Sequence, residues 1–566
     1  MSNSNTSQVA PIIKIAAHTL LVAVLCSLPH WVALARNRGD YLPFSVSPAV
    51  SALTFDETHA YGPPARRFME TGRIQAEADD FERRDLSAGI PFIPGAILGA
   101  MGWTLRSLER AFIAADFIFP ALLFLLYYAI SRQAVSTVSF RRLIAWSSVL
   151  IPFGLKNTFW QGEDAFLTPL EITRTPQPEI SFLFLLLAAV LFAKALRETS
   201  PFLLIAAGIA SGAVVYCYYY YAVAWGITLG LVCLCGVFWR SSVVWQRTLV
   251  VISLMVVLAI PFALATFKGN AEGGQTHLLA RMGAFTHRPD WPALAAALAL
   301  TLVLLFAAKN FFAKYPGYFV LATLINGALY GMNFQILSGF ETQPWHFWKR
   351  LALPIGFFLA ALITARAVEN SRWRLKFAEP ILLLLLIGST ATRLTIAGLR
   401  TAPEQRASKP EFQLLTWART HLPGNEVIGT TDPQLILLIP ALTTDYTYVP
   451  SGLRSLTSTA EIVNRYDELA CLLGIPPSGV SKAAAVPNHF EHSTELMQVL
   501  GLTYTRDPAV ERSFVKQYRM FSQHCRAPHG RLDYLILPAN SSNPDPAAHL
   551  IYSNSGYQLL SLNSVR

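Results

Sequence analysis

Residues 201–238 read PFLLIAAGIASGAVVYCYYYYAVAWGITLGLVCLCGVF, an apolar run that contains no charged side chain. A membrane-spanning helix needs about 20 mostly apolar residues, so this run is long enough for two spans that meet near the tyrosines at 218–221. A single helix across the same run would lower the number of spans by one. Similar apolar segments occur before and after this run, from near the N-terminus to about residue 400. Together they predict an α-helical polytopic membrane protein.

The sequence predicts about eleven membrane spans, each of them a mostly apolar segment of roughly the length that a bilayer requires. We place them at 11–35, 110–131, 142–156, 179–196, 201–218, 219–238, 246–267, 291–309, 316–334, 351–368 and 377–398. The first segment is longer than a signal peptide and ends without a small-residue cleavage site. We therefore expect it to stay in the protein as the first helix.

The composition excludes several other classes of protein. Of the 566 residues, 53% are hydrophobic and 14% are charged, whereas soluble globular proteins carry about 25% charged residues. A soluble enzyme, a disordered chain and a coiled coil are therefore excluded. The formal net charge is +10, which we assign to cytoplasmic loops and their contact with anionic membrane lipids. No basic patch interleaved with aromatic residues occurs, so we expect no nucleic-acid partner.

Basic residues gather in alternate short connections between the predicted spans. They are Arg132, Arg141, Arg142, Lys194, Arg197, Arg240, Arg247, Lys309, Lys314, Arg366, Arg372, Arg374 and Lys376. Because cytoplasmic loops are enriched in Lys and Arg, we expect these connections to be cytoplasmic. An odd number of spans then puts residues 401–566 outside the cytoplasm. The functional face is expected on the longer outer loops, at 36–109, 157–178, 268–290 and 335–350.

Residues 401–566 have the composition of a soluble domain, distinct from a membrane module at 1–400. One helix and three strands are predicted in it, at 411–421, 427–432, 532–537 and 557–560. They indicate a small extracytoplasmic α/β domain. It contains no nucleotide-binding or nucleophile motif, so we expect it to dock a partner or shape the acceptor site. Cys471 and Cys525 lie in this domain, and the sequence leaves open whether they form a disulfide.

The first outer loop carries two adjacent acids, in the segment Phe55-Asp56-Glu57-Thr58-His59-Ala60-Tyr61. We expect a turn at Gly62-Pro63-Pro64, followed by a short helix over residues 65–72. A carboxylate at a membrane boundary is partly desolvated, which raises its pKa and makes it a better general base. The alternative is that Asp56 and Glu57 are two solvated loop acids.

This combination of many spans, an acidic pair in the first outer loop and an extracytoplasmic terminal domain resembles the GT-C superfamily of polytopic glycosyltransferases. Members of that superfamily use polyprenyl-phosphate-linked sugars. The resemblance implies that Asp56 deprotonates an acceptor hydroxyl, while Glu57 binds the acceptor or a metal beside it. We expect His59 and Tyr61 to bind substrate. The sequence leaves open whether a divalent metal, Mg²⁺ or Mn²⁺, takes part.

A phosphate leaving group needs cations near the outer membrane surface. Arg174 lies just before a predicted span, and His346 and Arg350 lie four residues apart, on one helical face, before another. We expect these three residues to contact the donor phosphate. The alternative is a snorkelling Arg174 and an aromatic belt with flanking cations around residues 345–350.

Further residues of the outer loops are expected to bind substrate. They are Glu163, Asp164, Gln343 and Trp345. The aromatic face of Trp345 suits stacking on a sugar ring, whereas Glu163 and Asp164 are also compatible with a solvated loop. The loop 268–290 is expected to be either a mobile lid or an unstructured connection.

The sequence therefore predicts a membrane glycosyltransferase of the bacterial inner membrane. It would move a sugar from a polyprenyl-phosphate donor to an unknown glycan, lipid or protein acceptor. Two alternatives stay open: a transporter or lipid flippase, and a non-catalytic membrane assembly protein. A transporter needs polar groups inside the membrane, and the predicted spans contain almost none.

Overall fold

The computed structural model describes residues 6–43, 52–86, 89–152, 171–173, 175, 177–271, 273–307, 309–310, 315–341, 343–370, 378–485, 495–502 and 507–562. The chain divides into two compact units. The helical unit contains Met1–Val32, Phe112–Phe262 and Ala284–Leu399. The terminal unit contains Ala33–Ala111, Ala263–Gly283 and Arg400–Arg566. The predicted boundary near residue 400 stays a prediction, because the terminal unit combines the end of the chain with two outer-loop segments.

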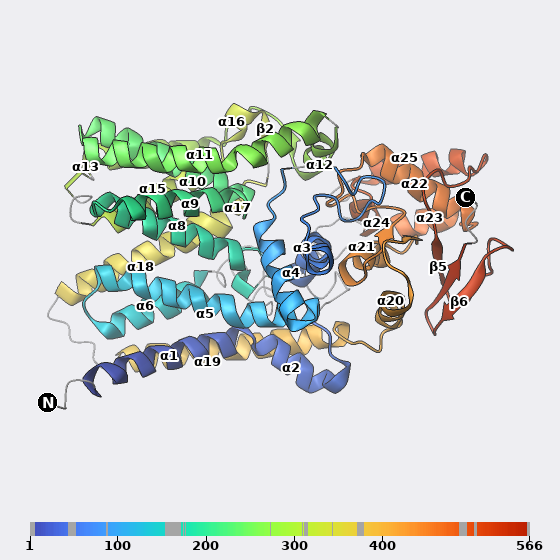
Figure 1. Ribbon diagram of the computed structural model, residues 1–566, viewed down its shortest axis with the longest axis horizontal. Helices are drawn as coiled ribbons and strands as arrows, with labels where there is room; N and C mark the ends of the chain where they lie inside the picture. The colour runs from blue at the N-terminus through green and yellow to red at the C-terminus, as the bar shows by residue number, and fades with distance from the viewer. Residues whose placement is uncertain are drawn as a thin grey trace. The chain divides into compact units, whose positions relative to one another are not determined.

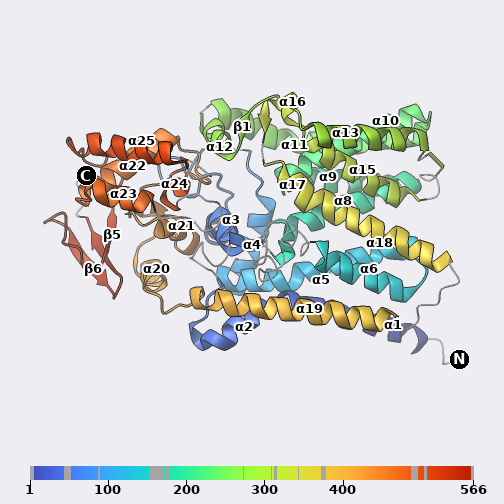
Figure 2. The same cartoon turned by 180° about the vertical axis from the view of Figure 1, so that it is seen from behind.

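The helical unit is built from apolar helices, together with short helical turns of three to five residues. They are α1 (Thr6–Cys26), the start of α2 (Leu28–Asn37), α5 (Leu108–Ala134), α6 (Val138–Leu150), η3 (Glu171–Thr173), α8 (Glu179–Arg197), α9 (Pro201–Val215), α10 (Tyr219–Phe238), α11 (Ser242–Ala271), α13 (Trp291–Ala307), α15 (Pro316–Gly331), α16 (Gln335–Ser338), α17 (Trp345–Phe347), η4 (Trp348–Ala352), α18 (Leu353–Asn370) and α19 (Ala378–Thr401). Figures 1 and 2 show α6, α18, α8 and α15 side by side. Strands β1 (Ala284–Phe285) and β2 (Phe340–Glu341) pair antiparallel.

Each predicted span contains a helix in the described part of the chain, but the count of about eleven spans is not confirmed. Among the described residues, six helices are long and apolar enough to cross a membrane, or seven if the bent pair Ile12–Cys26 and Leu28–Asp40 is one span. Helices α6, α9, α13 and α15 have 13, 15, 17 and 16 residues. These lengths are shorter than the roughly 20 residues of a typical span.

The run 201–238 forms two helices, as its tyrosine cluster predicts. Helix α9 starts at a Ser200 cap whose side chain accepts from the Leu203 amide, and α10 starts at Tyr219. Tyr218 between them has an extended backbone, with φ −162° and ψ 125°. Gly208 and Gly212 let α11 pack closely, because an added Cβ would lie 2.5 and 2.6 Å from atoms of Leu254 and Leu258. Because glycine has no side chain, these two positions allow α9 and α11 to pack closely.

The terminal unit contains a mixed five-stranded sheet. Its helices are η1 (Arg38–Asp40), α3 (Ala52–Thr71), α4 (Ile93–Leu105), α12 (Gly274–Met282), η5 (Ala402–Glu404), α20 (Pro410–His421), α21 (Pro433–Leu442), α22 (Thr459–Leu472), α23 (Pro477–Ala484), α24 (Glu495–Val499) and α25 (Pro508–Phe521). Its strands are β3 (Val427–Gly429), β4 (Tyr446–Thr447), β5 (Tyr534–Pro538), β6 (His549–Ser553) and β7 (Tyr557–Ser561). The strand order is β4-β3-β5-β7-β6, with β3 parallel to β4 and β5, and β7 antiparallel to β5 and β6. The predicted helix and the three predicted strands are all present.

A disulfide closes part of the terminal unit. Cys471 and Cys525 are bonded, with a Cα–Cα distance of 5.9 Å and a sequence separation of 54 residues. The bond ties the end of α22 to the segment after α25. A cross-link stabilises a fold chiefly by restricting its unfolded state.

We predict that Cys471→Ser lowers the free energy of unfolding of the terminal unit by about 2–4 kcal/mol. Thermal unfolding of the purified protein in detergent, with and without a reductant, measures this difference. Cys233→Ser, at a free cysteine of α10, is the control and should respond to the reductant as the unchanged protein does. A Cys471→Ser variant with an unchanged unfolding temperature would contradict the prediction.

Candidate functional site

The two ends of the helical unit carry different chemistry. At the end where α5, α8 and α18 finish, charged side chains bind neighbouring connections. Glu369 accepts from the Ser136 hydroxyl at 3.0 Å, and Arg366 donates to the Ala134 carbonyl at 3.0 Å. Arg247 donates to the carbonyl of Leu196 at 3.1 Å. These contacts group the connections that the charge pattern predicts to be cytoplasmic.

At the opposite end, where α5 and α8 begin, four polar side chains, most of them buried, form a series of hydrogen-bond contacts. His30 Nε2 lies 2.9 Å from Asp116 Oδ2. The Thr175 hydroxyl lies 2.6 Å from the other oxygen of Asp116 and 2.8 Å from Glu179 Oε2. Glu179 is 1% exposed, and Asp116 is also buried. We call these four residues the acid chain.

The acid chain must hold a proton between its two carboxyl groups. The Thr175 hydroxyl carries one hydrogen, so it donates to only one of the two carboxyl oxygens beside it. The other short contact requires a protonated carboxyl group, because two ionised acids would repel the hydroxyl oxygen. Glu179 Oε1 is buried and has no hydrogen-bond partner among the described residues. The Thr175 hydroxyl is therefore the hydrogen-bond link between the two acids.

A second polar group continues along the same end of the unit. The Gln177 amide donates to the Cys217 carbonyl at 2.6 Å, next to the break between α9 and α10. The adjacent Tyr218 places its hydroxyl 2.9 Å from His346 Nδ1 and accepts from Arg350 Nη1 at 2.6 Å. The structure thus brings His346 and Arg350 together on one tyrosine, as their spacing of four residues predicts. We call Tyr218, His346 and Arg350 the cation cluster.

The Tyr218 hydroxyl links the two other members of the cation cluster. Its oxygen accepts from Arg350 and lies within hydrogen-bond distance of His346 Nδ1. Arg350 is 5% exposed, and its carbonyl accepts from the Tyr221 hydroxyl at 3.0 Å. It lies in the π-helical turn η4, an irregularity that is frequent at functional sites. A guanidinium with an adjacent imidazole is suited to bind a phosphate.

Two other predicted substrate residues lie beside the cation cluster. Gln343 Oε1 is 3.5 Å from the Tyr220 hydroxyl. Trp345 is 51% exposed, and the Lys349 ammonium lies 5.5 Å from the centre of its ring. Arg174, Glu163 and Asp164 lie outside the described residues. Tyr220 and Tyr218 were not predicted as site residues, although four consecutive tyrosines within an apolar run were a usable signal.

The acidic pair lies on a helix rather than before a turn. Helix α3 runs through Asp56, Glu57, His59 and Tyr61 and continues across Pro63 and Pro64. The turn predicted at Gly62-Pro63-Pro64 is therefore wrong. The side chains of Asp56, Glu57 and His59 lie outside the part of the structure that is described.

Two buried arginines hold α3 in place within the terminal unit. Arg67 donates to the carbonyls of Thr444 and Asp445 at 2.5 and 3.2 Å, and its guanidinium lies 3.8 Å from the centre of the Tyr446 ring. Arg66 contacts Glu109 at 3.4 Å. These contacts explain why the helix can continue across its prolines, because packing and ion pairs compensate for lost backbone hydrogen bonds.

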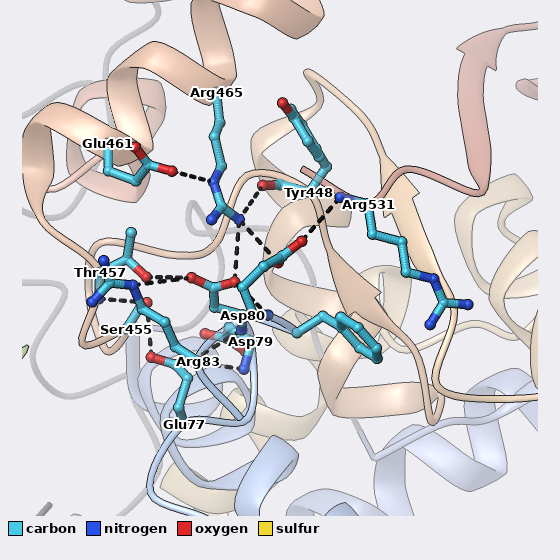
Figure 3. Close-up of polar contacts among 12 residues, drawn as sticks. Glu77, Asp79, Asp80, Arg83, Tyr448, Ser455, Thr457, Glu461, Arg465 and Arg531 are labelled. Carbon is cyan, nitrogen blue, oxygen red and sulfur yellow. Dashed lines mark hydrogen bonds and ion pairs between the residues drawn. The ribbon is translucent and has the colours of Figure 1, made fainter. Parts of the chain in front are cut away.

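An acidic segment after α3 forms buried polar contacts with residues 454–465 of the terminal unit (Figure 3). Asp79 binds Arg454, and Asp80 Oδ1 lies 3.1 Å from Arg465. Glu77 accepts from the Ser455 hydroxyl at 2.8 Å and from the Leu456 amide at 2.6 Å. Burial, together with the carboxylates of Asp79 and Asp80, raises the pKa of Glu77 to about 7. Buried polar contacts thus bind the first outer loop to residues 454–465.

The segment 268–290 contains helices and a strand, so the alternative of an unstructured connection is wrong. Its residues continue α11 and form α12 and β1. Arg281 on α12 is buried and donates to the carbonyls of Ser455 and Thr457. The same short stretch of chain therefore binds both Glu77 and Arg281.

The described residues provide no group of three or more His, Cys, Asp or Glu side chains that could hold a metal ion. The acids of the buried segment are instead engaged by arginines and hydroxyl groups.

We predict that Thr175→Val lowers the free energy of unfolding of the helical unit by about 1–3 kcal/mol, since it leaves the two buried acids without their shared partner. Thr175→Ser keeps the hydroxyl group and is the control, so it should unfold as the unchanged protein does. Unfolding temperatures of the purified variants measure both effects. Equal damage from the two substitutions would contradict the prediction.

A pH dependence follows from His529, whose Nδ1 lies 2.8 Å from Glu468 and whose Nε2 lies 2.8 Å from Glu461. Burial disfavours the imidazolium, but the two carboxylates outweigh it and hold the pKa of His529 above its usual 6.5. The folded state therefore binds this proton more tightly than the unfolded state. The resulting stability is fully present below about pH 6.5 and is lost as pH rises through the folded pKa.

We therefore expect His529→Gln to lower the unfolding temperature of the terminal unit at pH 6 more than at pH 8. His524→Gln, at an exposed histidine nearby, is the control and should show no such difference. If His529→Gln lowers the unfolding temperature equally at both pH values, the ion pairs of His529 with Glu461 and Glu468 are excluded.

Comparison with known proteins gives structural likenesses alone. No family model and no curated protein matches the chain. It is similar to archaeal oligosaccharyltransferase AglB from Archaeoglobus fulgidus, in complex with an inhibitory peptide and a dolichol-phosphate, with 11% identity, a TM-score of 0.43 and coverage of 97% of this chain and 74% of AglB. It is also similar to ArnT from Cupriavidus metallidurans. The undecaprenyl phosphate complex has 10% identity, a TM-score of 0.39 and coverage of 95% and 97%. The apo state of ArnT has 10% identity and a TM-score of 0.41, with coverage of 99% of this chain and 98% of ArnT.

Proposed function

We propose that this protein is a membrane glycosyltransferase that moves a sugar from a polyprenyl-phosphate donor to an acceptor outside the cytoplasm. The observation that carries the proposal is the buried Arg350 in the cation cluster, at the start of an apolar helical segment that extends from Trp345 to Glu369. A lipid phosphate has the matching chemistry, because its headgroup needs cationic donors and its tail needs an apolar surface.

The reaction proposed is a displacement at the anomeric carbon of the sugar. The acceptor oxygen forms a bond to that carbon, while the bond from carbon to the phosphate oxygen breaks. The phosphate leaves with the bonding electrons, and Arg350 and His346 stabilise its charge. Arg174 would contribute a third phosphate contact. Donors fixed in a low-dielectric site stabilise such developing charge more strongly than donors in water.

The acceptor proton goes to a carboxylate, for which we propose Asp56, with Glu57 assisting. Helix α3 carries both residues, and the buried Arg66 and Arg67 hold that helix in the terminal unit. A base held on a rigid helix loses little freedom on reaction. Further proposed substrate contacts are His59, Tyr61, Glu163, Asp164, Gln343 and Trp345.

We further propose that the terminal unit lies outside the cytoplasm of a bacterial inner membrane. The disulfide between Cys471 and Cys525 favours this side, because such bonds persist in oxidising compartments. Arg247 and Arg366 lie at one end of the helical unit, and this grouping favours a cytoplasmic position for that end.

A transporter is the second candidate, and the acid chain is the observation that favours it. Asp116 lies within α5, one of the helices long enough to span a membrane, and buried acids in such helices can line a transport path. A transporter would move its substrate without changing it chemically, so the two candidates differ in their products.

We predict that Arg350→Gln weakens binding of undecaprenyl phosphate by the purified protein about 10- to 100-fold, as expected for the loss of one charge-assisted contact. Asp56→Asn should leave that binding intact but reduce transfer of sugar to glycan products in cells by about 10²–10⁴-fold, the contribution of a general base. Native mass spectrometry measures lipid binding, and glycan analysis of the cells measures transfer.

The controls are matched in position and charge. Arg366→Gln removes an arginine from the opposite end of the same helical segment, and Asp85→Asn removes an exposed acid of the first outer loop. Both should behave as the unchanged protein. Normal glycan products from the Asp56→Asn variant would refute the enzymatic proposal, and altered flux with unchanged products would favour the transporter.

A further inference from the structure

The terminal unit contains a pocket that the proposed transfer reaction does not use. It has a volume of about 390 Å³ and lies where the parallel strands β3 and β5 end and β7 begins. Thr431 and Asp432 follow β3, and Leu537 and Pro538 close β5. Ligand sites in sheets of this kind commonly lie at the carboxyl ends of parallel strands, and a few hundred cubic ångströms suit a small molecule.

Asp432 gives the pocket a fixed acidic side. Its carboxylate accepts from the amides of Gln434 and Leu435 at 2.9 and 3.3 Å, and thereby caps α21. It also accepts from the Tyr557 hydroxyl at 2.9 Å. Burial and the Asp432 carboxylate raise the pKa of Tyr557 well above its usual value, so this hydroxyl keeps its hydrogen.

The remaining polar groups of the pocket are available to a ligand. The side chains of Thr431 and Gln434 line the pocket and have no hydrogen-bond partner within the described ranges. The Tyr557 oxygen donates its hydrogen to Asp432 and so presents lone pairs to a donor. Together these groups offer both donors and acceptors but no positive charge, since no residue lining the pocket is Lys, Arg or His.

Apolar groups complete the lining of the pocket. Pro538 pairs with Tyr557 across β5 and β7, so their rings lie on the same face of the sheet, whereas the Leu537 side chain packs in the core on the other face. A ligand that contacts both kinds of lining group must carry both hydroxyl groups and C–H groups. A phosphate or a carboxylate does not fit, because Asp432 repels anions and already occupies the amides at the start of α21.

We propose that this pocket binds a neutral sugar ring through Thr431, Asp432 and Gln434, with its apolar face against Pro538 and Tyr557. A pyranose has this combination of hydroxyl groups and C–H faces, and side-chain amides and carboxylates supply the hydrogen bonds that orient it. The inference goes beyond the proposed function and does not depend on it, because binding at this pocket involves no transfer.

The test is binding of uncharged methyl glycosides of glucose, galactose and mannose to the full-length purified protein, measured by saturation-transfer NMR. We expect at least one of them to bind with a dissociation constant of about 1 mM, typical of a weak small-ligand site. Gln434→Ala should weaken binding about tenfold, the effect of one or two lost hydrogen bonds. Glucose 1-phosphate should bind more weakly than the neutral glycosides.

Three further variants keep the test decisive. Gln413→Ala, at an exposed glutamine of α20 in the same unit, should bind as the unchanged protein does. Thr431→Val keeps the shape of the side chain and serves if Gln434→Ala fails to fold. Asp56→Asn should retain sugar binding, which separates this inference from the proposed catalysis. Absence of binding by all three glycosides, unchanged binding in both pocket variants, or tighter binding of glucose 1-phosphate would overturn the proposal.

Discussion

Buried charges must be matched by hydrogen-bonding groups, and this constraint organises both units of the protein. Removing one partner of a buried ion pair typically costs about 3–5 kcal/mol, because the remaining charge is left in a medium of low dielectric. In the helical unit, Arg350 is matched by Tyr218, and Asp116 by His30 and Thr175. These contacts join helices at one end of the unit, and each of them requires a particular face of the helices that it joins.

The sequence was sufficient for elements whose signal is local. Each apolar run forms a helix, and the tyrosines at 218–221 mark the break between α9 and α10. Helix length was not predictable, because a helix ends where its backbone finds other partners, which composition does not show. The helix and strands of residues 401–566 were predictable, but the inclusion of two outer-loop segments in the terminal unit was not. It depends on contacts such as that between Asp79 and Arg454, which lie 375 residues apart.

The candidate site could be predicted in part, for reasons that are visible in particular residues. The spacing of His346 and Arg350 predicted a shared face, and the structure places both on Tyr218. The acid chain was missed, although Asp116 lies inside a predicted span and Glu179 begins another. A single acid in an apolar run has little weight in a hydropathy average, yet such a residue is costly to bury and therefore indicates a partner.

The distribution of charge separates two kinds of ligand chemistry. The cation cluster has an arginine and a histidine, which suit an anionic headgroup on a lipid. The pocket of the terminal unit has an aspartate and uncharged polar groups, which suit a neutral molecule. A sugar attached to lipid phosphate would be repelled by Asp432, whereas a neutral glycoside would offer no negative charge to Arg350. Electrostatics alone therefore disfavours exchange of the two ligands between the two sites.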